Sequence, residues 1–89
     1  MELEWDARKA ATNLRKHGVS FPFAARIFLD ENRIERADDR NDYAETRFVT
    51  IGLIDGFEIV VVYTLRQDKI RMISARKADQ HEIEAYWNS

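Results

Sequence analysis

The sequence contains no cysteine, one proline and three glycines among its 89 residues. The absence of cysteine excludes a disulfide framework and any thiolate metal site, and it is consistent with a reducing compartment. With only two histidines and no cysteine, the composition also argues against a zinc site. The low glycine and proline content excludes a collagen-like or low-complexity chain. We therefore expect an ordinary globular protein that requires no cofactor.

Long hydrophobic runs are missing as well. The longest, residues 59–63, is far shorter than the roughly 20 residues that cross a bilayer. The first ten residues, MELEWDARKA, are charged from the second position and lack the apolar segment of a signal peptide. A chain of this length has room for one hydrophobic core. We expect a cytoplasmic protein with no membrane contact and one domain, residues 1–89.

An excess of positive charge is also absent, since the formal net charge is −2. That balance by itself argues against a nucleic-acid partner, because phosphate-binding domains are usually basic. The acidic residues, however, are concentrated in residues 31–58, which contain eight acidic and four basic residues. The outer thirds each carry five basic and four acidic residues. A local basic cleft is therefore compatible with the composition, which leaves the partner open.

The helix signals lie near the two ends of the chain. Asp6 is a candidate N-cap for a helix that ends near His17, before Gly18. Ser20 is a candidate N-cap for a second helix that ends near Asp30, with the only proline in its first turn. Asp79 is a candidate N-cap for a third helix over residues 80–87.

Alternating and apolar segments between the helices predict strands. Residues 2–5 and 33–37 are candidate short strands, and residues 38–42 have the composition of a turn. Residues 45–54, 57–66 and 69–76 are separated by two-residue turns, Asp55-Gly56 and Gln67-Asp68. These signals predict an α+β fold, in which an antiparallel β-meander sheet packs with two N-terminal helices and one C-terminal helix.

Lys16 and His17 form the first candidate site, at the end of the first predicted helix. One interpretation is structural, because positive charge there complements the helix dipole by about 0.3–1 kcal/mol per residue. The other is functional: both side chains project into a phosphate-binding cleft, where an imidazole can accept or donate a proton near neutral pH.

A second candidate site lies on the predicted strands. Strict alternation places Glu45 and Arg47 on one face with Val49, Ile51 and Leu53. It places Ser74 and Arg76 on one face with Ile70 and Met72, and Arg71 on the opposite face with Ile73 and Ala75. Arg66 ends the central strand. A single arginine on such a face is explained if its aliphatic side chain runs along the sheet and its guanidinium reaches water. Several converging guanidinium groups would instead bind phosphate oxygens bidentately.

Motifs along nearly the whole chain resemble the BrnT family of type II toxins. They are Trp5-Asp6, Lys9, Asn13-Leu14-Arg15-Lys16-His17-Gly18-Val19, Phe21, Ala24-Ala25, Phe28-Leu29-Asp30, Glu45-Thr46-Arg47-Phe48, Ile51-Gly52, Val62-Tyr63-Thr64, Arg66, residues 70–78 (IRMISARKA), Glu82 and Tyr86. The least similar stretch is residues 31–43. The resemblance implies a RelE-like fold, RNA cleavage that arrests growth, and a BrnA-like antitoxin that alone contacts operator DNA. It points to Lys16, His17, Glu45, Arg47 and Arg76 as catalytic residues. The strand pattern adds Arg66, Arg71 and Ser74 as substrate-binding candidates.

Metal-free cleavage of RNA is chemically accessible to such residues, because the 2′-hydroxyl is a nucleophile within the substrate. We expect His17 or Glu45 to be the base, with His17 as the acid if Glu45 is the base. Arg47, Arg76 and Lys16 would hold the phosphate. This hypothesis requires the end of the first helix to converge with the strand arginines.

Two other functions remain open. The first is a non-catalytic module that holds RNA or a protein on the same basic face; it predicts salt-sensitive RNA binding without cleavage products. The second is a helix-turn-helix DNA binder over residues 6–30. It is disfavoured because Arg26 is the only basic residue of its second helix that could contact bases in a DNA groove.

Overall fold

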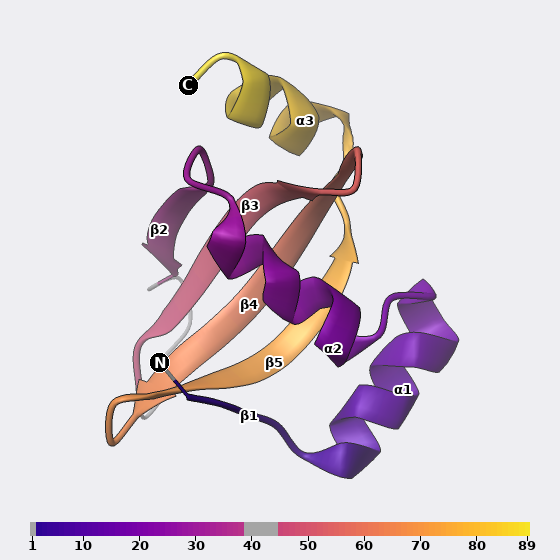
Figure 1. Ribbon diagram of the computed structural model, residues 1–89, viewed down its shortest axis with the longest axis vertical. Helices are drawn as coiled ribbons and strands as arrows, with labels where there is room; N and C mark the ends of the chain where they lie inside the picture. Colours follow the sequence, from indigo (N-terminus) through magenta and orange to yellow (C-terminus); the bar gives the residue numbers. More distant parts are fainter. Residues whose placement is uncertain (1, 39–44) are drawn as a thin grey trace.

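A computed structural model describes residues 2–38 and 45–89 and shows one twisted five-stranded sheet (Figure 1). Its strands are β1 (Leu3–Glu4), β2 (Ile34–Asp38), β3 (Arg47–Ile54), β4 (Phe57–Arg66) and β5 (Lys69–Lys77). They are arranged in the order β1-β5-β4-β3-β2. The three long strands form the predicted meander, and the predicted strand at residues 33–37 pairs beside it as β2. Of the predicted turn at residues 38–42, positions 39–42 lie outside the described residues.

The helices are α1 (Ala7–His17), α2 (Phe21–Ala24) and α3 (Gln80–Trp87), with a 3-10 helix, η1 (Ala25–Leu29), after α2. All three predicted N-caps are confirmed, because the side chains of Asp6, Ser20 and Asp79 accept hydrogen bonds from backbone N–H groups of the following turn. Gly18 ends α1 with a φ of 69°, as expected for a left-handed C-cap. No helix in the described part of the chain is long and apolar enough to cross a membrane.

Two features of the predicted architecture are wrong. The sheet is mixed rather than purely antiparallel, because β1 pairs in parallel with β5. The second helix is also not one regular helix to Asp30, since α2 gives way to the tighter η1 after Ala24. A two-residue edge strand carries no periodicity that could reveal its direction, which depends on where the chain runs before α1.

The helices lie on both faces of the sheet. We call one face the α1 face; its strand residues Ile59, Val61, Met72 and Ala75 pack with Phe21 and Ile27. We call the other the α3 face, where Val49, Ile51 and Val60 pack with Tyr86. The core on the α1 face is the larger one. Residues that share a face with Val49 and Val60 therefore lie opposite α1 and α2.

A β-bulge in β5 corrects the predicted faces of that strand. Tyr63 pairs with Met72, but the preceding Val62 pairs with Ser74, so Ile73 is an extra residue in β5. One extra residue moves every later side chain to the opposite face. Ser74 and Arg76 consequently share the α3 face with Arg71, rather than the face of Ile70 and Met72.

The junction between η1 and β3 is tight. A Cβ atom on Gly52 would lie 2.6 Å from Cγ1 of the fully buried Ile27 and 3.2 Å from Oδ2 of Asp30. Asp30 accepts hydrogen bonds from the backbone N–H groups of Leu53 and Asn32 and from the Tyr86 hydroxyl. Burial raises the pKa of Asp30, but these hydrogen bonds outweigh it and hold the pKa below its ordinary value.

Replacing Gly52 with alanine is expected to lower the free energy of unfolding by about 1–3 kcal/mol, because the new methyl group forces the fully buried Ile27 side chain to shift. Urea unfolding measures this loss. The double variant Gly52→Ala, Ile27→Val, which removes a methyl group from the crowded side chain, is expected to be less destabilised than the sum of both single variants. Strict additivity would contradict the steric explanation.

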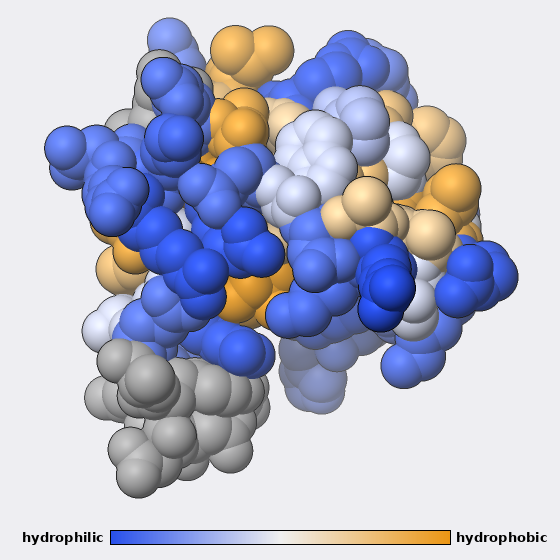
Figure 2. Space-filling view, turned by 90° about the horizontal axis from the view of Figure 1, so that it is seen from below, coloured by the Kyte–Doolittle hydropathy of each residue, from blue (hydrophilic) through white to orange (hydrophobic). Residues whose placement is uncertain are grey.

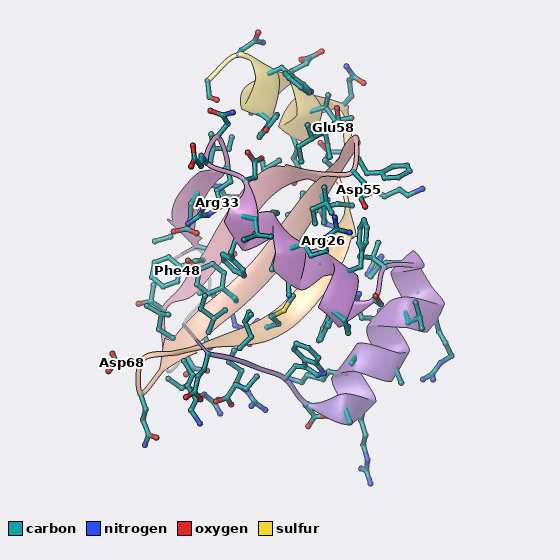
Figure 3. All side chains as sticks on the ribbon, in the orientation of Figure 1. Arg26, Arg33, Phe48, Asp55, Glu58 and Asp68 are labelled. Atoms are coloured by element: carbon teal, nitrogen blue, oxygen red, sulfur yellow. The ribbon has the colours of Figure 1, made fainter. Side chains whose placement is uncertain are left out.

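Polar contacts also join the outer elements. Arg26 in η1 forms a bidentate ion pair with Asp55 in the β3–β4 turn, with both N–O distances at 2.8 Å (Figure 3). Asp55 and the two residues of the β4–β5 turn, Gln67 and Asp68, have positive φ values, consistent with the predicted two-residue hairpins. The end of the molecule that carries the β4–β5 turn is largely hydrophilic (Figure 2).

Candidate functional site

Three arginines meet on the α3 face near the β4–β5 turn. Arg47 in β3 pairs with Thr64 in β4, which in turn pairs with Arg71 in β5. Arg66 follows Thr64 on the same face of β4, since alternate residues of a strand share a face. Adjacent strands are about 4.8 Å apart, so the Cα atoms of Arg47 and Arg71 are separated by about 10 Å across Thr64. We call Arg47, Arg66 and Arg71 the arginine cluster.

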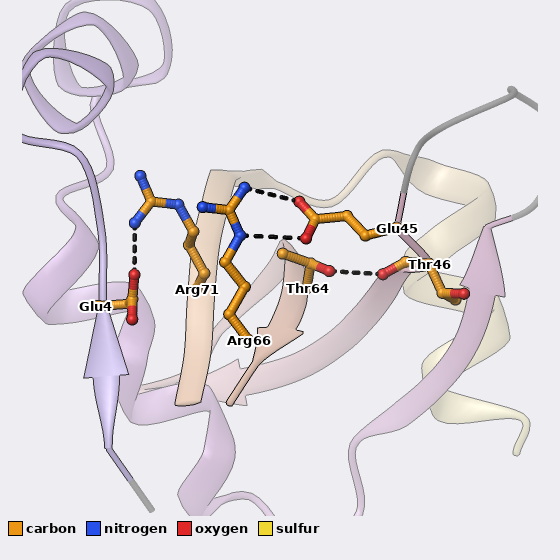
Figure 4. Close-up of polar contacts among 6 residues, drawn as sticks. All are labelled: Glu4, Glu45, Thr46, Thr64, Arg66 and Arg71. Atoms are coloured by element: carbon orange, nitrogen blue, oxygen red, sulfur yellow. Dashed lines mark hydrogen bonds and ion pairs between the residues drawn. The ribbon is translucent and has the colours of Figure 1, made fainter. Parts of the chain in front are cut away.

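Carboxylates position two members of the arginine cluster (Figure 4). Nε and Nη2 of Arg66 donate to the two carboxylate oxygens of Glu45 at 3.1 and 3.0 Å. Nη1 of Arg71 donates to Oε2 of Glu4 at 2.5 Å. Below them, the buried Thr64 hydroxyl donates to the Thr46 carbonyl at 2.7 Å and fixes the start of β3 against β4. The guanidinium groups of Arg66 and Arg71 are therefore oriented before any ligand binds.

Arg66 is the most exposed member of the arginine cluster, and the cluster is electrostatically coupled to Glu45. The side chains of Arg66 and Glu45 are 50% and 34% exposed. Hydrogen bonds from Arg66, aided by the charges of Arg47 and Arg71, hold the pKa of the Glu45 carboxyl below its ordinary value. The same contact raises the pKa of Arg66. Glu45 is therefore ionised at neutral pH and can accept a proton, while Arg66 stays charged.

Ser74 and Arg76 lie farther along the same face of β5. Nη1 and Nη2 of Arg76 donate to the two carboxylate oxygens of Glu82 at 2.7 and 2.8 Å. Glu82 also accepts a hydrogen bond from the Asp79 backbone N–H and completes the capping box of α3. The side-chain hydrogen bond from Arg76 holds the pKa of Glu82 below its ordinary value. The Arg76–Glu82 pair thus attaches the start of α3 to the sheet.

Lys16 and His17 lie elsewhere, at the C-terminal end of α1. This helix is fixed to β5 by the Asn13 side chain, whose amide donates to the carbonyls of Val19 and Ala75 and accepts from the Ala75 N–H. Leu14, two residues before Lys16, and Gly18, directly after His17, line a groove that also includes Lys77 of β5. From Arg71 to Lys77, β5 covers about 20 Å at about 3.3 Å per residue.

The predicted convergence of His17 and Lys16 with the strand arginines is therefore wrong. His17 lies at the opposite end of β5 from Arg71 and, unlike Arg76, on the α1 side of the sheet. The structure instead brings Glu45, Arg47, Arg66 and Arg71 together. Local sequence could not show this, because the direction in which α1 crosses the sheet depends on the parallel pairing of β1 with β5.

Comparison with known protein families shows to which family the chain belongs. Residues 5–82 match the family described as the ribonuclease toxin, BrnT, of type II toxin-antitoxin systems. The chain belongs to the BrnT family. A search of curated proteins gives no match. The matched segment contains every residue that the sequence motifs singled out as a candidate for catalysis or substrate binding.

Membership in the BrnT family has two consequences. The chain is a ribonuclease toxin by family, and as the toxin of a type II system it has an antitoxin partner. Within the described part of the chain, no three His, Asp or Glu side chains are grouped in a way that could hold a metal ion.

One histidine on the α3 face of this BrnT-family chain has surroundings that the sequence did not indicate. His81, at the start of α3, lines a groove of about 270 Å³ together with Arg36 of β2 and Glu82. The side chain of His81 is exposed. Its position beside β2 depends on the docking of α3, for which the sequence offers only the candidate N-cap Asp79 and the apolar edge that includes Tyr86.

Proposed function

We propose that this toxin is a metal-independent endoribonuclease that cleaves RNA at the arginine cluster. The observation that carries the proposal is the placement of three arginines, Arg47, Arg66 and Arg71, on one face of the sheet beside an ionised carboxylate, with Arg66 half exposed. Planar guanidinium forks bind phosphate oxygens bidentately and stabilise the charge that develops on them. The family assignment to ribonuclease toxins agrees with this chemistry.

The proposed reaction uses the 2′-hydroxyl of the RNA as the nucleophile. Glu45 accepts the 2′ proton, the 2′ oxygen forms a bond to the adjacent phosphorus, and the bond from phosphorus to the 5′ oxygen breaks. The leaving oxygen takes a proton from solvent at this exposed site, so the products are a 2′,3′-cyclic phosphate and a 5′-hydroxyl. The phosphate replaces Glu45 as the partner of Arg66, which raises the pKa of Glu45 and makes it a stronger base at the moment of proton transfer.

The other residues implied by the family resemblance receive separate roles in this proposal. Ser74 and Arg76 extend the phosphate-binding face along β5 beyond the arginine cluster. Lys16 and His17 are too remote to act on the same phosphate as Glu45, and their exposed side chains contact RNA or the antitoxin at the end of α1. We further propose a BrnA-like antitoxin that provides all contacts with operator DNA, and a cytoplasmic site of action.

Incubation of the purified toxin with single-stranded RNA in the presence of EDTA tests the proposal. We expect cleavage to persist, with products that carry a 2′,3′-cyclic phosphate, because the nucleophile is part of the substrate and guanidinium groups stabilise the charge. An RNA with 2′-deoxy residues at the cleaved positions is the matched control and is expected to resist. Loss of cleavage in EDTA with recovery on added Mg²⁺ would contradict metal independence. Salt-sensitive RNA binding without any products would favour the non-catalytic module instead.

A further inference from the structure

The groove that contains His81 lies between the β2–β3 edge of the sheet and α3. Its floor is formed by Val49 and Ile51, which are 7% and 9% exposed, and by the half-buried Ile34. Arg36 and His81 stand at its rim, and both are exposed. The groove thus combines an apolar floor with two flat, polar side chains.

Size and lining favour one planar ring system as the ligand. The volume of about 270 Å³ is just below the range of roughly 300–1,000 Å³ that holds drug-sized molecules. Unpaired bases of RNA stack on imidazole rings and guanidinium planes and are recognised at their polar edges. Glu82 lines the same groove, and its Oε2, which accepts one hydrogen bond from Arg76, can accept a second from an amino group of a base.

The groove begins one step along β3 from the arginine cluster. Val49 is the next residue after Arg47 on the same face of β3, about 7 Å along the strand. This step is on the scale of one nucleotide. A phosphate held by Arg47 would therefore leave its attached base within reach of Val49 and the groove, rather than on the far side of the sheet.

We propose that this groove is a nucleobase subsite, which receives one base of single-stranded RNA next to the cleaved phosphate and gives the toxin a preference for that base. The proposal rests on the function proposed above, since it takes RNA as the ligand. An antitoxin side chain is the competing occupant. Arg36 at the rim, and Arg47 one step along β3 from Val49, place positive charge on the side opposite the Glu82 carboxylate, which favours a ligand that carries a base on a phosphate backbone.

Filling the groove provides the test. Ala85 lines it from α3 and is exposed, so Ala85→Phe places an aromatic ring in the groove without disturbing the core. Ala11→Phe is the matched control, because Ala11 is an exposed alanine of α1, which packs on the other face of the sheet. His81→Ala removes the stacking ring without adding volume, and thermal unfolding establishes that each variant is folded.

The first measurement is cleavage of a set of RNA oligonucleotides that differ in the bases around the cleaved bond. We expect Ala85→Phe and His81→Ala to raise the KM for the preferred sequence about 5- to 100-fold, the range expected for one stacked base, and to flatten the preference. Ala11→Phe should match the wild type. Unchanged KM and unchanged preference in both groove variants would overturn the proposal.

The second measurement separates this inference from the nuclease function. Binding of the same oligonucleotides with 2′-O-methyl groups, which block the nucleophile, is measured by fluorescence anisotropy. If the wild type cleaves no RNA but its binding weakens in both groove variants, the nuclease function fails and the base subsite stands. If RNA binding and cleavage are unchanged while co-expressed antitoxin no longer neutralises Ala85→Phe, the groove belongs to the antitoxin and the subsite is refuted.

Discussion

Replacement of Arg47 with alanine is expected to lower the rate of RNA cleavage about 10²- to 10³-fold and to abolish growth arrest on expression. Loss of one preorganised donor to a developing negative charge typically has this effect. Arg47 lies in register with Thr64 and Arg71, so its removal opens one side of the arginine cluster. Single-turnover cleavage of a short RNA measures the chemical step, and thermal unfolding shows whether the variant remains folded.

Two further variants test whether the loss of cleavage comes from the guanidinium group of Arg47. Arg47→Lys keeps the charge but loses the planar fork, and we expect it to recover only part of the activity. Arg8→Ala is the matched control for charge, because Arg8 is an exposed arginine of α1. Full activity in a folded Arg47→Ala variant would remove the arginine cluster from the mechanism.

Comparison of Glu45→Gln with His17→Ala tests where the cleavage centre lies. Glu45→Gln removes the proposed base and is expected to slow cleavage about 10²- to 10⁴-fold, whereas His17→Ala should cost less than about tenfold on a short RNA. The reason is that His17 and Glu45 lie at opposite ends of the molecule. A larger loss in His17→Ala would place the chemistry at the end of α1.

Replacement of Asn13 with alanine is expected to lower the free energy of unfolding by about 2–4 kcal/mol. The Asn13 side chain is 6% exposed and pairs with both backbone groups of Ala75 and with the Val19 carbonyl, at 2.8–3.1 Å. Its removal leaves buried backbone groups without partners, and each such group costs about 1–3 kcal/mol unless water replaces the side chain. Chemical denaturation measures the loss, which is a large fraction of the stability of a small domain.

Two further variants, Thr12→Ala and Asn13→Asp, test whether the loss of stability comes from the hydrogen bonds of the Asn13 side chain. Thr12 is the exposed neighbour of Asn13 on α1, and its replacement should change stability by less than about 0.5 kcal/mol. Asn13→Asp keeps the acceptor for the Ala75 N–H but directs a carboxylate at two carbonyl oxygens, so we expect it to destabilise as much as alanine or more. A fully stable Asn13→Asp variant would contradict the assigned hydrogen bonds.

Local sequence patterns were sufficient to predict most of the secondary structure. Side chains of Asp6, Ser20 and Asp79 cap helices where the sequence predicts them, because N-capping is a contact between near neighbours in the chain. Alternation in β3 also places Arg47 correctly beside Val49 and Ile51, since that strand is regular. The family motifs are likewise local, and the matched family confirms what they indicate.

Strict alternation failed in β5, where Ile73 is an extra residue. Apolar and polar residues alternate on both sides of Met72-Ile73, and the phase changes at this pair of adjacent apolar residues. The bulge is recognised only from pairing with β4, where Val62 faces Ser74 and Tyr63 faces Met72. Without it, Arg71 and Arg76 would point to opposite faces, and the phosphate-binding face would not extend along β5.

The sequence by itself determined the helices, the meander, the capping residues and the family of this toxin, because all of these depend on neighbours in the chain. Only the tertiary structure decided that β1 runs parallel to β5, that α3 packs opposite α1, and that Glu45 meets Arg66 while His17 lies far away. These outcomes depend on which distant segments pair and on which face each helix is buried. Such choices are made by packing over the whole sheet, and no short stretch of the chain encodes them.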